Sequence, residues 1–232
     1  MTPYFYYLPK AVLAAIILVA VTGLIDIKEA KHLWYTDRQD FILFMATALA
    51  TLVLGVEEGI LVGVVLSIAM VIYQVSYPHV AELGRLPNST EYRNVRRFDH
   101  LIENEQLLII RFDAPLFFAN LDFFTEYLKN ASKNKPHLKH LILDFSAVNR
   151  VDSSALHLLH DLIERYKAKD IQVYFVDVKG PVRDAMKCSK LVEKLGESYF
   201  FLAIYNATEV IRGAQDGAID KEIVLQSNLT SD

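Results

Sequence analysis

The sequence has a single cysteine, Cys188, among 232 residues, and its first third is poor in charge. One thiol permits no intramolecular disulfide and no cysteine-rich metal site, which fits a reducing compartment. Of the 24 Lys and Arg and 28 Asp and Glu, only 10 fall within residues 1–78. The net charge of −4 is divided evenly between this segment and the rest, so neither part has the basic surface that nucleic-acid binding requires. The charge-poor third has the composition of a membrane segment.

Three charge-free apolar runs lie in this third, at residues 11–25, 41–56 and 59–81. The first extends backwards through aromatic residues 4–7 and Lys10, a pattern typical of a membrane interface, and with this extension it spans the bilayer. Only Glu57 and Glu58 separate the second run from the third, so these two runs predict a tight helical hairpin. We therefore predict three transmembrane α-helices within residues 1–78.

Small and acidic residues mark the predicted hairpin. Gly55, Gly59 and Gly63 recur at intervals of four, which predicts a stripe of small residues that lets another helix pack closely in the membrane. Glu57 and Glu58 leave two interpretations open. In the first, a carboxylate lies within the membrane and is a candidate for ion or proton coupling. In the second, the two acids are solvated residues at the turn of the hairpin.

Basic residues flank the hairpin on both sides: Lys28, Lys31 and Arg38 in the loop before it, and Arg85, Arg93, Arg96 and Arg97 after it. The positive-inside rule places both flanks in the cytoplasm. With three spans the first residue then lies outside, so we expect the natural polypeptide to extend further. Pro78 and Gly84 break periodicity and predict a juxtamembrane linker at residues 79–104, whose arginines either meet anionic lipid headgroups or are solvated.

Residues 105–213 alternate between strand and helix patterns. The predicted strands are residues 107–112, 116–119, 141–145, 171–178 and 199–201. Between and after them lie four predicted helices, which begin near Asn120, Asp152, Gly180 and Asn206, with the third running through Leu191. This alternation predicts a small α/β domain with helices layered on a sheet. Residues 214–232 are polar and aperiodic, and they predict a flexible tail.

The sequence offers few residues for catalysis. It has no glycine-rich phosphate loop, no Cys–His metal spacing and no glycine-flanked nucleophile, so we predict no enzymatic activity, no cofactor and no metal site. His157, His160 and Glu164 share one face of the predicted second helix, opposite its apolar stripe. They could form an exposed zinc site or an ordinary solvated face, and the absence of supporting ligands in the sequence favours the solvated face.

The segment Asp152-Ser153-Ser154 holds the candidate regulatory residues. It begins a helix, and a helix N-terminus attracts anions through its free N–H groups and the positive end of its dipole. Phosphorylation of Ser153 or Ser154 would place about two negative charges there, beside Asp152. The alternative is ordinary capping by Asp152 and the two serines, which physical considerations alone favour.

Residues 142–146 (Ile-Leu-Asp-Phe-Ser) and 151–156 (Val-Asp-Ser-Ser-Ala-Leu) resemble the signature of STAS domains. These domains, which have a mixed sheet with helices packed on it, occur in anti-sigma factor antagonists and in the cytoplasmic tails of SulP-type (sulfate permease family) anion transporters. The membrane third favours the transporters, because it resembles their last transmembrane segments and linker at residues 6–16, 23–26, 54–57 and 78–85. The resemblance covers residues 2–213.

The resemblance implies the C-terminal part of a secondary active transporter for an inorganic anion such as sulfate or bicarbonate. It implies a multi-pass protein of the plasma membrane, in contact with lipid, whose cytoplasmic STAS domain serves regulation, assembly or trafficking. A homodimer is also implied, with substrate-binding residues upstream, in the missing N-terminal helices. STAS antagonists that are phosphorylated usually carry Gly where this chain has Ala155, which weakens the case for a phosphoserine switch. The alternative is a membrane-tethered STAS regulator, similar to an anti-sigma factor antagonist, without transport activity.

Overall fold

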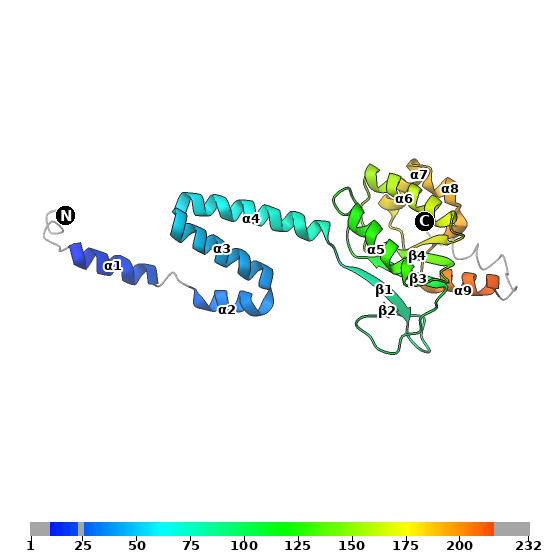
Figure 1. The fold of residues 1–232 in the computed structure, drawn as a ribbon, viewed down its shortest axis with the longest axis horizontal. Helices are drawn as coiled ribbons and strands as arrows, with labels where there is room; N and C mark the ends of the chain where they lie inside the picture. Colours follow the sequence, from blue (N-terminus) through cyan, green and yellow to red (C-terminus); the bar gives the residue numbers. More distant parts are fainter. Residues whose placement is uncertain (1–9, 23–25, 216–232) are drawn as a thin grey trace. The chain divides into compact units, whose positions relative to one another are not determined.

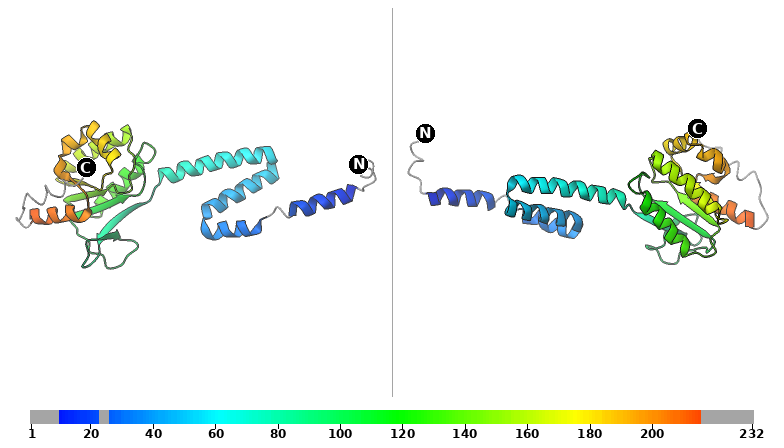
Figure 2. Two further views of the ribbon diagram at one scale, coloured as in Figure 1. Left: turned by 180° about the vertical axis from the view of Figure 1, so that it is seen from behind. Right: turned by 45° about the horizontal axis from the view of Figure 1, so that its top comes forward.

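The computed structural model describes residues 10–22 and 26–215 and divides into two compact units, Met1–Ile72 and Tyr73–Asp232. The described part of the first unit is helical, and the second is an α/β domain (Figures 1 and 2). The predicted aromatic extension of the first membrane helix, at residues 4–7, lies outside the described residues. So does most of the predicted tail, from residue 216 onward.

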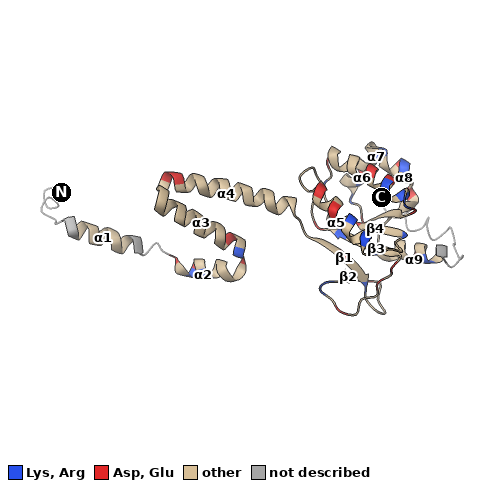
Figure 3. Cartoon of the chain, in the orientation of Figure 1, with Lys and Arg blue, Asp and Glu red and all other residues tan. Residues whose placement is uncertain are grey.

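Within the described residues, four helices precede the sheet: α1 (Lys10–Thr22), α2 (Ile27–Thr36), α3 (Arg38–Leu54) and α4 (Val56–Ser76). Three of them, α1, α3 and α4, lie on the three predicted apolar runs, and charged residues are scarce along them (Figure 3). Judged by length and composition alone, α4 is the one helix among those described that is long enough and apolar enough to cross a membrane. Its 21 residues span about 30 Å, the thickness of a hydrocarbon core.

Helix α2 replaces the loop that was predicted between the first and second runs. Asp26 begins this helix, because its Oδ1 accepts hydrogen bonds from the backbone N–H groups of Lys28 (3.0 Å) and Glu29 (3.1 Å). Near its end, Trp34 packs edge-to-face on Phe41 of α3, with ring centroids 4.9 Å apart. The apolar runs alone did not predict this helix, because its sequence is mixed rather than apolar.

The predicted hairpin is formed by α3 and α4, and its glycines have two different places. Gly55 ends α3 with φ of +112°, a conformation that suits glycine, and it therefore lies before α4 rather than on the predicted stripe. At Gly59, which is buried, an added Cβ would lie 2.2 Å from Oγ1 and 2.5 Å from Cα of Thr51. At Gly63 it would lie 2.8 Å from Cγ2 of Thr47. The two helices thus pack closely at Gly59 and Gly63.

The second unit is built on a six-stranded sheet with strand order β2-β1-β3-β4-β5-β6. Its strands are β1 (Val80–Arg85), β2 (Tyr92–Asn94), β3 (Leu107–Phe112), β4 (His140–Asp144), β5 (Gln172–Val176) and β6 (Phe200–Phe201). Strand β1 runs antiparallel to both β2 and β3, whereas β3, β4, β5 and β6 are parallel. This mixed sheet confirms the predicted α/β fold class.

The prediction of a linker at residues 79–104 is wrong, because this segment supplies β1 and β2. Ala81 and Leu83 alternate with less buried residues along β1. Both are buried in an apolar cluster with residues of the neighbouring strands. Their burial outweighs the breaker signals of Pro78 and Gly84. Gly84 has a packing role instead, since an added Cβ there would lie 2.9 Å from the Cβ of Leu101.

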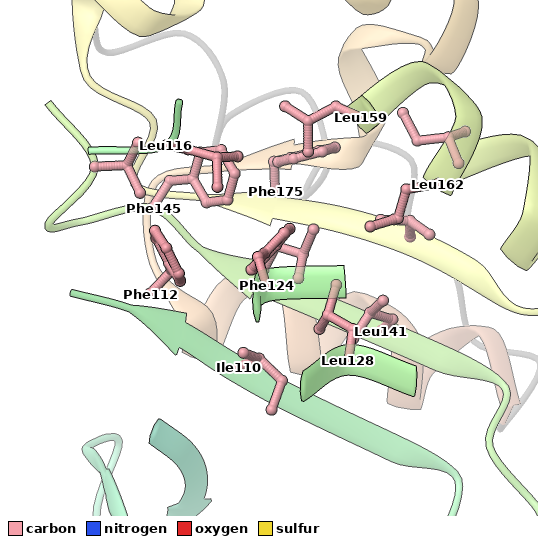
Figure 4. Packing of buried hydrophobic residues seen from close by; sticks show 14 of the residues in the cluster. Ile110, Phe112, Leu116, Phe124, Leu128, Leu141, Phe145, Leu159, Leu162 and Phe175 are labelled. Carbon is pink, nitrogen blue, oxygen red and sulfur yellow. The ribbon is translucent and has the colours of Figure 1, made fainter. Parts of the chain in front are cut away.

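Helices cover both faces of the sheet. One face carries α5 (Leu121–Lys133), α6 (Ser153–Lys167), α7 (Gly180–Cys188) and α8 (Leu191–Leu195), and the other carries α9 (Ile204–Gln215). The larger core lies under α5 and α6, where Phe124, Leu159 and Leu162 meet side chains of the central strands (Figure 4). Successive side chains along a strand point to opposite faces of the sheet. On the face opposite the larger core, Ala207 and Ile211 of α9 pack against the strand side chains that point to that face.

Three smaller predictions also differ from the structure. Residues 116–119 do not form a strand: only Leu116 pairs, through a single parallel bridge to Val151. The predicted helix from Gly180 to Leu191 is interrupted at Lys190, whose φ of +61° separates α7 from α8. The last helix begins at Ile204 rather than Asn206 and extends to Gln215, into the predicted tail.

Candidate functional site

Asp152 organises the start of α6 and the loop beside it. Its Oδ1 accepts a hydrogen bond from the Ala155 N–H at 2.8 Å, which caps the helix. Its Oδ2 accepts from the Phe118 N–H at 2.9 Å. The backbone joins the same two segments, because Leu116 N–H donates to the Arg150 carbonyl at 3.0 Å. One carboxylate therefore fixes both the helix and the adjacent loop.

Ser153 and Ser154 occupy the first turn of α6 and are exposed, whereas the following Ala155 is fully buried. Within the described residues, neither serine hydroxyl makes a hydrogen bond, so the capping is done by Asp152 rather than shared. Phe118, which Asp152 positions, is 72% exposed. The candidate site is thus an open helix N-terminus with an exposed aromatic side chain on the neighbouring loop.

Two further carboxylates lie at the C-terminal ends of parallel strands: Asp144 is the last residue of β4, and Asp113 directly follows β3. Their surroundings shift their pKa values in opposite directions. Burial raises the pKa of Asp144, although a hydrogen bond from the Ser146 N–H (2.9 Å) and the charge of Arg111 oppose the shift. Burial alone would also raise the pKa of Asp113, but the hydrogen bonds from Arg111 Nε (2.6 Å) and His79 Nδ1 (2.7 Å) outweigh it and lower this pKa.

We predict that Asp144→Asn stabilises the second unit at neutral pH. The raised pKa means that the folded state disfavours the ionised Asp144, so its contribution to stability is present below pH 3.8 and is lost as pH rises through the folded-state pKa. Asparagine removes the charge, and its side-chain oxygen can still accept the hydrogen bond from the Ser146 N–H. Thermal unfolding of the full chain at several pH values should show the variant's advantage growing as pH rises above 3.8. An advantage that is absent at neutral pH would contradict this assignment.

The predicted zinc alternative finds no support in the arrangement of its three residues. His157 is exposed, His160 Nε2 lies 3.0 Å from the Ser189 carbonyl, and Glu164 pairs with Lys194. The hydrogen bond and charge of Lys194 lower the pKa of Glu164. His160 and Glu164 thus connect α6 to α7 and α8. In the part of the chain that the structure describes, no three His, Cys, Asp or Glu side chains gather as a metal site would require.

Comparisons with known families match both units. Residues 100–209 match the family model of the STAS domain, and residues 1–47 match that of the Sulfate permease family. The chain is similar to the sulfate permease family in its first unit and to STAS domains in its second. The STAS match contains the sheet from β3 onward with α5, α6 and the Asp152-Ser153-Ser154 segment.

Two plant sulfate transporters are similar to both units of this chain. Sulfate transporter 4.1, chloroplastic, of Arabidopsis thaliana is 37% identical over 220 residues, which are 90% of this chain and 32% of that protein. High affinity sulfate transporter 1 of Stylosanthes hamata is 32% identical over 89% of this chain and 32% of its own length. The structure of the murine Solute Carrier 26 family member A9 anion transporter, inward-facing, matches with a TM-score of 0.74 at 27% identity, covering 92% of this chain and 34% of that one. The chain spans about a third of the length of the curated relatives it matches.

Sequence reasoning missed two polar features of the STAS domain. Asn120 stands at the predicted cap position of α5, but its side chain is buried and does not cap the helix. Its Oδ1 accepts from the Phe117 N–H (3.1 Å), and its Nδ2 donates to the Pro115 carbonyl (2.9 Å), so it holds the loop before α5. The Asp113 cluster was also missed, because its members come from segments that the sequence assigned to different parts.

We predict that Asp152→Ala destabilises the STAS domain by about 2 kcal/mol, because it removes both a helix cap and the bond to Phe118. Asp152→Asn is the matched variant: its single carbonyl oxygen can replace one of the two bonds, so an intermediate loss is expected. Hydrogen exchange of peptides covering residues 116–160 in the full chain measures the effect. Equal protection in both variants and the wild type would contradict the dual role of Asp152.

Proposed function

We propose that this chain is the C-terminal part of a secondary active transporter for inorganic anions of the sulfate type. The observation that carries the proposal is the joint occurrence of the Sulfate permease family match and the STAS domain in one chain. The similarity to sulfate transporters and to an anion transporter structure, each over about nine-tenths of this chain, supports it. The anion site itself is expected in the remaining two thirds of such a transporter, outside this chain.

The side chains of the first unit support a place in a helical membrane bundle. Large apolar residues on α3 and α4 are exposed, among them Leu52 (83%) and Val53 (72%), which a helix in water would not leave uncovered in such number. Gly59 and Gly63 allow close helix packing in the way that membrane interfaces use small residues. We propose that these helices contact lipid and the rest of the transporter, with the STAS domain in the cytoplasm and the plasma membrane as location.

We further propose that the STAS domain regulates or assembles the transporter as a homodimer through the surface at the start of α6. Phosphorylation of Ser153 or Ser154 would place about two negative charges at the helix N-terminus, where the dipole favours them by about 0.3–1 kcal/mol. The charge would lie beside Asp152 and would disturb its bond to Phe118. Mass spectrometry of phosphopeptides from the native protein tests this: unmodified Ser153 and Ser154 under all growth conditions would reject the switch.

The native mass and the uptake activity test the proposed function together. An antibody raised against residues 107–213 should detect a species well over twice 26.4 kDa in denatured source membranes. Vesicles that contain this species should take up radiolabelled sulfate saturably, and excess unlabelled sulfate or bicarbonate identifies the preferred anion. A fluorescent tag at the C-terminus, with protease added to intact cells, locates the STAS domain.

The second candidate is a membrane-tethered STAS regulator without transport activity. The exposed Phe118 beside Ser153 and Ser154 favours it, because such a surface suits a protein partner. A single native species near 26.4 kDa, with no sulfate uptake, would select this candidate over the transporter.

A further inference from the structure

The last turn of α4 belongs to the second unit, which begins at Tyr73. Only residues 77–79 separate the end of this helix from the start of β1. In this short connection the ring of Pro78 fixes one backbone angle. Before it, Tyr77 packs edge-to-face on Phe123 of α5, with ring centroids 5.5 Å apart, and the Tyr77 N–H donates to the Tyr73 carbonyl at 3.1 Å. Tyr77 thus contacts both the last turn of α4 and the α/β domain.

His79 fixes the other end of this connection beside β3. Its carbonyl accepts a hydrogen bond from the Asp113 N–H at 3.1 Å, and its ring Nδ1 lies 2.7 Å from the Asp113 Oδ2. Arg111 holds the same carboxylate through its Nε at 2.6 Å. Because the residues on both sides of Pro78 are held, the connection has little freedom to swivel. The end of α4 is therefore attached firmly to the α/β domain.

Asn120 binds the backbone of α4 itself. Its side chain is completely buried, and its Nδ2 donates to the Val75 carbonyl at 3.4 Å and to the Pro115 carbonyl at 2.9 Å. Its Oδ1 accepts a hydrogen bond from the Phe117 N–H at 3.1 Å. The last carbonyl groups of a helix have no partner within that helix, and the Val75 carbonyl is one of them. Asn120 therefore caps the end of α4, although its position in the chain would suit a cap of its own helix, α5.

The loop at residues 115–120 connects this cap to the start of α6. On the α6 side, Asp152 Oδ2 accepts a hydrogen bond from the Phe118 N–H at 2.9 Å. On the α4 side, Asn120 accepts from the N–H of the preceding loop residue, Phe117. These two N–H groups are neighbours in the backbone, so the position of one depends on the position of the other. The loop is thus held at adjacent residues by the start of α6 and by the residue that caps α4.

We infer that residues 115–120 form a joint that couples the start of α6 to the last turn of α4, and that Asn120 is the positioning residue at the α4 end. The inference rests on the regulatory role proposed above for the start of α6, and it names how that surface reaches α4. Loss of the bond between Asp152 and Phe118 frees the joint to shift. Both N–H groups of the Asn120 amide are engaged, so the amide cannot follow the shift without losing a bond. Its 3.4 Å contact with Val75 is the longest of its three side-chain hydrogen bonds and is the first to break.

The test measures hydrogen exchange at the end of α4 in the full chain in detergent. The probe is the Tyr77 N–H, which is protected by its bond to the Tyr73 carbonyl and lies in peptides that cover residues 70–80. Asp152→Ser keeps a hydroxyl that can cap α6, but one short side chain cannot also reach Phe118. Although Asp152 bonds to no residue of α4, this variant should speed the exchange of the probe about fivefold.

A double-variant cycle separates coupling from independent damage. Asn120→Ala removes the bond to α4 directly and should speed exchange at least as much as Asp152→Ser does. When both changes are made, exchange should be no faster than in Asn120→Ala alone, because the joint is already released. Effects of the two changes that multiply would show that the two residues act independently, and would overturn the inference.

Thr208→Val is the matched control for a loss of stability away from the joint. It removes a buried hydroxyl that lies 2.8 Å from the Tyr92 hydroxyl, on the face of the sheet that carries α9. It should lower the melting temperature and change exchange at the end of α4 by less than about twofold. Equal acceleration in Asp152→Ser and Thr208→Val, or none in Asp152→Ser, overturns the inference. This comparison decides the matter by itself if Asn120→Ala fails to fold.

The outcome is separable from that of the proposed function. Exchange at the end of α4 involves no transport and no phosphate, so a negative result overturns the joint and leaves the uptake and phosphopeptide experiments to judge transport and the switch. Conversely, unmodified Ser153 and Ser154 would reject the phosphoserine switch, whereas faster exchange in Asp152→Ser would still support the joint.

Discussion

Replacing Gly59 with alanine should force α3 and α4 apart. The new methyl group would lie 2.2 Å from Oγ1 and 2.5 Å from Cα of Thr51, and the Cα belongs to the backbone of α3, which cannot rotate away. Overpacking of this kind costs about 1–3 kcal/mol or more. Alanine gains at most about 1 kcal/mol of helix propensity over glycine, so the clash outweighs the gain.

Gly63→Ala is the matched control in the same helix. Its nearest neighbour is the Thr47 Cγ2 at 2.8 Å, a side-chain methyl group that a rotation about χ1 can move, so a smaller loss is expected. Hydrogen exchange of peptides from α3 and α4, in the full chain in detergent, measures the opening of the hairpin. If the peptides of α3 and α4 exchange at the same rate in the Gly59→Ala and Gly63→Ala variants, the close approach at Thr51 is not what holds the two helices together.

The hairpin and the central strands could be predicted because their signals are local. An apolar run broken only by Glu57 and Glu58 indicates two adjacent helices, and the run at residues 141–145 indicates a buried strand. In both cases a few consecutive side chains determine the element. The cap at Asp152 was predictable for the same reason, since its partner Ala155 lies three residues away.

The strand β1 could not be predicted from such local signals. Pro78 and Gly84 indicate a break, and only pairing with β3, more than twenty residues later, makes Ala81 and Leu83 part of a core. Helix α2 was missed for a related reason: its start depends on Asp26, but its sequence is neither apolar enough nor regular enough to stand out.

The polar features of the second unit depend on contacts distant in sequence. His79, Arg111 and Asp113 join only when β1 lies beside β3.

Phe124→Ala should destabilise the STAS domain more than any surface change. Phe124 is completely buried, and its ring meets that of Phe112 edge-to-face, with centroids 5.0 Å apart. Truncation of such a side chain leaves a cavity in the core between α5 and the sheet and costs about 3–5 kcal/mol. A domain of ordinary stability has only about 5–15 kcal/mol in total, and the loss corresponds to a fall in melting temperature of roughly 10 °C or more.

Phe118→Ala gives the sharpest comparison, because it removes the same atoms six positions earlier in the chain. The Phe118 side chain is 72% exposed, so its truncation should change stability by no more than about 0.5 kcal/mol. Melting of the full chain, followed by hydrogen exchange of the STAS peptides, should separate the two variants by several degrees. Since Phe118 lies beside Ser153 and Ser154, a loss of regulation or assembly in a Phe118→Ala protein of normal stability would be an effect of the surface itself. Equal melting of the two variants would mean that α5 does not pack on the sheet as the structure places it.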